Sequence, residues 1–100
     1  MPTTTNALEA LDAAAVQWGR AFLDKILWER HLKAIDTARV QATNPAEQAE
    51  ASAQYRQVKE RTHAAQAQEA HLRSLCGQQA HSVGEQLPLE PEQFEPITQS

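Results

Sequence analysis

The chain has 100 residues and a formal net charge of −4, and although 41% of the residues are hydrophobic, only 5% are aromatic. This length suits one small domain, and the scarcity of large side chains predicts a thin core that a second copy or another protein would complete. The single cysteine, Cys76, excludes an intrachain disulfide framework. No signal peptide is predicted, because the N-terminus lacks a basic region followed by an apolar run. No membrane span is predicted, because charged residues interrupt the longest apolar stretch. We therefore expect a location in the cytoplasm of a bacterial or host cell, with a virus particle as a further alternative.

The negative charge is concentrated at the C-terminus. Residues 85–100 hold four of the thirteen acidic residues and none of the nine basic ones, so the rest of the chain is neutral. Proteins that bind nucleic acid need a basic surface against phosphate, which makes direct nucleic-acid binding an unfavoured interpretation.

The first predicted helix begins near Asn6 and ends by about Thr43. Large apolar residues recur in it at steps of three and four, which predicts one buried stripe. The members of this predicted stripe are Leu8, Leu11, Ala15, Trp18, Phe22 and Ile26. Gly19 interrupts it and predicts either a bend or close packing against a neighbouring helix.

Trp28, Leu32 and Ile35 fall on the side of this helix opposite the predicted stripe. A helix that is apolar on two sides is expected to be buried on both. We therefore predict that these three residues contact another chain or a separate segment rather than the second helix, with Trp28 as the main anchor. The alternative is that the C-terminal segment folds back and makes Trp28 part of an internal core.

The turn between the helices is predicted at Asn44-Pro45. Asn is a favoured N-cap, Pro fits the first helical position, and Glu47 follows three residues after the cap. Pro45 also disfavours helical geometry at Asn44, so the preceding helix should stop there.

The second predicted helix runs from Pro45 to about Cys76, with Ser82 as its outer limit and Gly77 as a candidate stop. A series of residues in this helix stands at alternating steps of three and four, which is the spacing of a helix that packs along one neighbour. The repeat consists of Tyr55, Val58, Thr62, Ala65, Glu69, Leu72 and Cys76. Most of these side chains are small or polar, so they permit close approach but stabilise it little.

Residues 85–100 contain Pro88, Pro91 and Pro96 and are expected to form an extended arm. Glutamates separate its large apolar residues, which predicts a docking segment with four candidate anchors. These anchors are Leu87, Leu89, Phe94 and Ile97. The alternative is a solvated acidic tail.

No pattern of catalytic residues, phosphate-binding glycines or cofactor ligands occurs in the sequence. Glu60 and His63 have the spacing found in metal-binding helical bundles, but the chain lacks the second pair that such a site requires. We therefore expect a protein that is not an enzyme and that takes no cofactor, metal or small-molecule substrate.

The sequence thus predicts an all-α fold, a long antiparallel helical hairpin over residues 1–84 with an extended Pro/Glu-rich arm over residues 85–100. The favoured function is a non-enzymatic protein–protein interaction, in a small helical subunit or accessory of a larger assembly such as a phage virion. The alternative is a small phage or bacterial inhibitor that blocks a host defence complex, as anti-CRISPR proteins do. A metal-binding helical protein is the least favoured interpretation.

Overall fold

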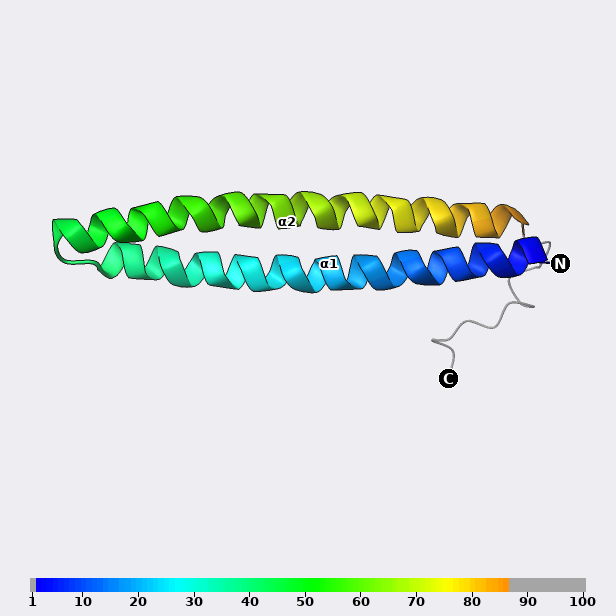
Figure 1. Ribbon diagram of the computed structural model, residues 1–100, viewed down its shortest axis with the longest axis horizontal. Coiled ribbons are helices and arrows are strands. Elements are labelled where there is room, and N and C mark those ends of the chain that lie inside the picture. The colour runs from blue at the N-terminus through cyan, green and yellow to red at the C-terminus, as the bar shows by residue number, and fades with distance from the viewer. Residues whose placement is uncertain (1, 87–100) are drawn as a thin grey trace.

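The computed structural model describes residues 2–86, with side chains from residue 6 onward, as two long helices that lie side by side in opposite directions (Figure 1). Helix α1 comprises Pro2–Gln41 and helix α2 comprises Pro45–Gln86. The predicted all-α hairpin is therefore confirmed. Because residues 2–86 form only two packed helices, each keeps a wide surface that the other cannot cover.

The turn is built as the sequence predicts. The backbone N–H of Glu47 donates a 2.7 Å hydrogen bond to Asn44 Oδ1, which is the expected N-cap. The N–H of Gln48 donates to the Asn44 carbonyl at 3.0 Å, so the helical hydrogen bonds of α2 begin at Asn44. Gln48 Nε2 also donates to the Ala42 carbonyl at 3.2 Å, across the end of α1.

Both helices are longer than the sequence patterns indicate. Helix α1 begins at Pro2 rather than near Asn6, and it continues through Gly19 without a break. Helix α2 passes Gly77 and ends at Gln86, so the first two residues assigned to the arm are helical. Val83 is only 5% exposed and stands one heptad after Cys76, so burial along the same side of α2 continues beyond Gly77. A glycine inside a helix costs only about 1 kcal/mol, and continued packing offsets that cost.

The predicted packing repeat of α2 is confirmed. Val58, Thr62, Ala65 and Glu69 are buried, and Tyr55, Leu72 and Cys76 are half-buried at the same spacing. We call the contact between this repeat and α1 the seam.

The side of α1 at the seam differs from the predicted stripe. Its half-buried residues alternate at steps of three and four, while Ala15 and Phe22 of the predicted stripe are exposed. Each step of four turns the position by about 40° around a helix, so a series of such steps leaves the seam, whereas alternating steps remain on it. The seam residues of α1 are Leu11, Ala14, Trp18, Ala21, Lys25, Trp28, Leu32 and Ile35.

Candidate protein-interaction surface

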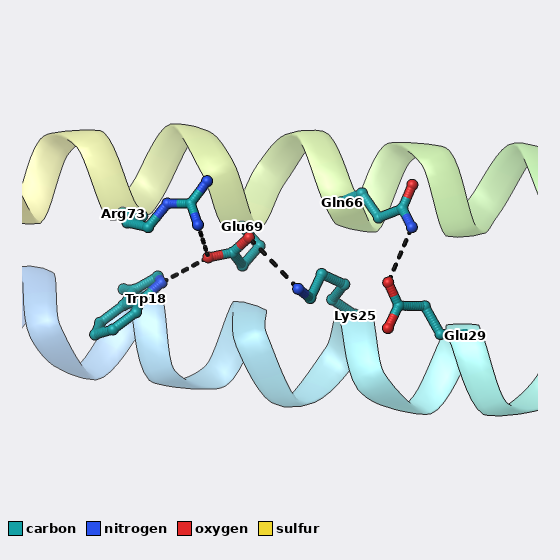
Figure 2. A network of polar contacts seen from close by, with 6 residues as sticks. All are labelled: Trp18, Lys25, Glu29, Gln66, Glu69 and Arg73. Atoms are coloured by element: carbon teal, nitrogen blue, oxygen red, sulfur yellow. Dashed lines mark hydrogen bonds and ion pairs between the residues drawn. The ribbon is translucent and has the colours of Figure 1, made fainter.

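A network of polar groups centred on Glu69 lies in the middle of the seam (Figure 2). Trp18 Nε1 donates a 2.9 Å hydrogen bond to Glu69 Oε2. Lys25 Nζ lies 3.8 Å from Glu69 Oε1, and Arg73 Nη1 lies 3.7 Å from Oε2. The carboxylate therefore receives one hydrogen bond and is flanked by two cations, although Glu69 itself is only 3% exposed.

This network fixes the alignment of the two helices. A buried carboxylate is costly unless it is paired, and Trp18 and Lys25 stand one heptad apart on α1, on either side of Glu69. A shift of one helix along the other would move both partners away from the carboxylate. Small seam residues such as Ala14, Ala21 and Ala65 select the alignment only weakly, so the polar contacts supply the specificity.

Two further polar contacts join the helices near the network. The hydroxyl of Thr62, which is 1% exposed, donates to the carbonyl of Val58 at 2.8 Å and lies 3.3 Å from the carbonyl of Trp28. Gln66 Nε2 donates to Glu29 Oε2 at 2.9 Å on the exposed edge of the seam, as Figure 2 shows. Polar residues thus occupy much of the contact that holds the hairpin together.

The expectation that Trp28 faces away from the second helix is wrong. Its backbone carbonyl lies beside Thr62 of α2, and the guanidinium of Arg61 lies 5.6 Å from the centre of its ring. Leu32 and Ile35 are half-buried and follow Trp28 at the spacing of the seam. The cause is the same as for the predicted stripe. Steps of four from Trp18 drift around the helix and turn the expected buried side away from Trp28.

The Trp28 side chain nevertheless remains partly accessible. Trp28 is half-buried, and together with Asp24, Leu27 and His31 it lines a shallow hollow on the flank of α1. A contact between Trp28 and a partner therefore stays a prediction, now at the edge of the seam rather than on a separate face.

Several large apolar side chains are exposed on the side of α1 that points away from the seam. Val16, Leu23 and Leu27 are 54%, 57% and 50% exposed. Gly19 and the half-buried Ile26 lie on the same side of the helix, because they stand three residues after Val16 and Leu23, respectively. We call Val16, Gly19, Leu23, Ile26 and Leu27 the outer face of α1.

The corresponding side of α2 has a different character. Its exposed residues between Arg56 and Ser74 are polar or small, and among the described residues the exposed large apolar side chain of α2 is Leu75, at 38%. These outward residues are Arg56, Gln57, Glu60, His63, Ala64, Ala67, Ala70, His71 and Ser74. One helix of the hairpin thus presents an apolar surface to the outside, and the other presents a surface suited to water.

The outer face and the role of Glu69 are not predicted from the sequence. Phe22 and Ile26 belong to the predicted buried stripe, but the structure leaves Phe22 40% exposed, with its ring 6.3 Å from that of Trp18. A signal was available: once positions 18, 21, 25 and 28 are taken as the seam, Val16 and Leu23 fall opposite it. The remaining predicted anchors lie outside the described residues, and they are Leu87, Leu89, Phe94 and Ile97.

Within residues 2–86, no group of three or more histidine, cysteine or acidic side chains is arranged to hold a metal ion. Neither α1 nor α2 contains a stretch that is both apolar enough and long enough to cross a membrane. Comparisons of the chain with protein-family models, curated proteins and solved structures found no match.

Proposed function

We propose that this chain is a non-enzymatic interaction protein that acts as a small helical subunit or accessory of a larger assembly, such as a virus particle. The observation that supports this proposal is the outer face of α1, where Val16, Leu23 and Leu27 are each at least half exposed. An exposed apolar surface on a small protein is typical of a site that another protein covers.

Burial of this surface would be energetically favourable. Complete burial of a Val or Leu side chain contributes roughly 1.5–3 kcal/mol, so three such residues offer a substantial driving force for association. The hairpin itself buries few large apolar side chains, since Val58, Ala65 and Val83 are the buried hydrophobic residues of the described part. A partner would therefore add the apolar contact that two helices alone do not provide.

The proposal includes a secondary role for the C-terminal segment. Residues 87–100 carry the four predicted apolar anchors between glutamates. Truncation after Gln86, the last residue of α2, is expected to preserve helical content by circular dichroism and to weaken partner binding. Unchanged partner binding by the truncated chain would remove this segment from the proposed interface.

Site-specific photo-crosslinking in cells of the natural source tests the main proposal. A photo-reactive amino acid at Leu23 is expected to capture a protein, either a copy of this chain or a component of its assembly. The same amino acid at Ala67, which is exposed on the outward side of α2, is the matched control and is expected to capture little.

The result also separates the two predicted function classes. Capture of repeated copies, or of particle components in fixed stoichiometry, supports an assembly subunit. Capture of one large complex by single copies of the chain would favour the inhibitor instead. Equal yields at Leu23 and Ala67 would contradict an interaction surface on α1.

A further inference from the structure

We propose that a second copy of this chain covers the outer face of α1, with the two α1 helices antiparallel and related by a two-fold axis at the level of residue 21. The inference rests on the proposed function in one respect, which is that the outer face is an interaction surface. It goes further because it names the occupant and its orientation. The arrangement of charge at the two ends of the outer face supports both.

Opposite charges flank the centre of the outer face, which is apolar apart from the exposed Arg20, one heptad before Leu27. Glu9 and Asp12 precede it, Arg30 and Lys33 follow it, and all four side chains are exposed. They share the helical side of the outer face, since each stands one heptad from one of its residues. Among the described contacts, the charged group of none of the four takes part in a hydrogen bond or an ion pair.

This arrangement of charge is complementary to that of a second copy only when the two α1 helices run in opposite directions. In an antiparallel pair with its axis at the level of residue 21, Glu9 stands level with Lys33 of the second copy, because the two are equally far from the axis along the helix. Asp12 stands level with Arg30 for the same reason, and the two-fold axis repeats both pairs. A parallel pair would instead place the acidic ends together and the basic ends together, which disfavours it.

The apolar centre fits the same alignment. Val16 of one copy stands level with Ile26 of the other, and Gly19 stands level with Leu23. Gly19 has no atom within 4 Å of the position where a Cβ would stand, so nothing within the hairpin requires a glycine there. A residue without a side chain opposite Leu23 of the second copy would allow the two helices to approach closely.

Charge reversal tests the proposal on the full-length chain. One variant carries Arg30→Glu with Lys33→Glu, and the other carries Glu9→Lys with Asp12→Lys. Sedimentation equilibrium of the unaltered chain is expected to show a dimer, and each variant is expected to dissociate about tenfold or more readily because like charges then meet at both ends. An equimolar mixture of the two variants is expected to restore the dimer, since each altered end then meets its complement.

Circular dichroism of each variant alone controls for folding. A chain that is monomeric at every concentration would overturn the proposal. So would a dimer that both variants leave intact, or variants that remain monomeric when mixed although circular dichroism shows both to be folded.

Orientation is tested separately by a distance measurement between spin labels. Val40 is 74% exposed and lies far from the proposed axis, so Val40→Cys in a Cys76→Ala background provides one label for each chain. The antiparallel pair is expected to give a separation of about 57 Å, from 19 residues on each side of the axis at 1.5 Å per residue. A separation below about 20 Å would show a parallel pair and overturn the proposed orientation.

The outcomes distinguish this inference from the proposed function. If photo-crosslinking at Leu23 captures a different protein while the purified chain stays monomeric, the outer face is an interaction surface but the second copy is not its occupant. If Leu23 captures nothing and the chain is monomeric, both fail.

Discussion

The seam and the outer face of α1 differ in the side chains that they bury and expose. Alongside large apolar residues such as Trp18 and Leu32, the seam buries a carboxylate and a threonine hydroxyl, with Glu69 and Thr62 at 3% and 1% exposure. The outer face leaves Val16 and Leu23 more than half exposed. Because both surfaces belong to one pair of helices, the polar groups at the seam do not reflect a lack of apolar residues in the sequence. Some of the apolar residues lie outside the seam instead.

This contrast indicates a division of roles. Polar groups buried between helices fix one alignment, because an unpaired charge in a buried position is costly. Apolar groups are less selective in alignment but supply much of the free energy of association. The hairpin therefore has a seam that specifies its geometry and an outer face that is suited to a further contact. The tests that follow compare the two surfaces.

Substitution at Glu69 is expected to have the largest effect on the hairpin. Glu69→Ala should lower the free energy of unfolding by about 3 kcal/mol, because Trp18 loses its acceptor and Lys25 loses its buried partner. Glu69→Gln keeps an acceptor for Trp18 and should cost only about 1–2 kcal/mol. Urea denaturation followed by circular dichroism measures both changes.

The exposed Glu60 is the matched control on the same helix, and Glu60→Ala should change stability by no more than about 0.5 kcal/mol. Similar losses for the Glu69 and Glu60 variants would show that the buried network contributes little to the seam.

A pair of leucines compares the two surfaces directly. Leu32→Ala, at the seam, should cost about 2 kcal/mol of unfolding free energy at every protein concentration. Leu23→Ala, on the outer face, should cost more as the concentration rises, because it weakens only the association that stabilises the folded chain. Thermal denaturation over a hundredfold range of concentration measures this difference. A cost of Leu23→Ala that does not vary with concentration would remove the distinction between the surfaces.

Gly19→Ala should affect folding and association in opposite directions. In dilute protein it should raise the free energy of unfolding by about 1 kcal/mol, since no neighbouring atom opposes the added methyl group. It should also weaken the dimer measured by sedimentation equilibrium, because the methyl group would stand between closely packed helices. Gly77→Ala, at an equally open position in α2, is the control and should stabilise the chain without altering association.

The turn supports the alignment of both surfaces. Asn44→Ala should lower the free energy of unfolding by about 1 kcal/mol through loss of the hydrogen bond from the Glu47 N–H. Thr43→Ala provides the control, because Thr43 is exposed and lies outside the described hydrogen bonds of the turn. Equal changes in the two variants, measured by denaturant titration, would argue against a stabilising cap at Asn44.

The local features of the chain were predictable from its sequence because they depend on neighbouring residues. The Asn44-Pro45 turn rests on capping and on the fixed geometry of proline, and the repeat from Tyr55 to Cys76 rests on helical spacing. The hairpin and the seam of α2 followed from these signals. The ends of the helices were less predictable, since α2 continues beyond Gly77 to Gln86 with Val83 buried.

Only the tertiary structure decided which side of α1 meets α2. Apolar residues surround the middle of this helix, so its sequence is compatible with more than one buried side, and steps of four pointed to the wrong one. Glu69 pairs with Trp18, which is 51 residues away in the sequence, and with Lys25. These contacts selected the observed side of α1. That choice brought Trp28 to the seam and left Leu23 on the outside, because two helices in contact can cover only one side of each other.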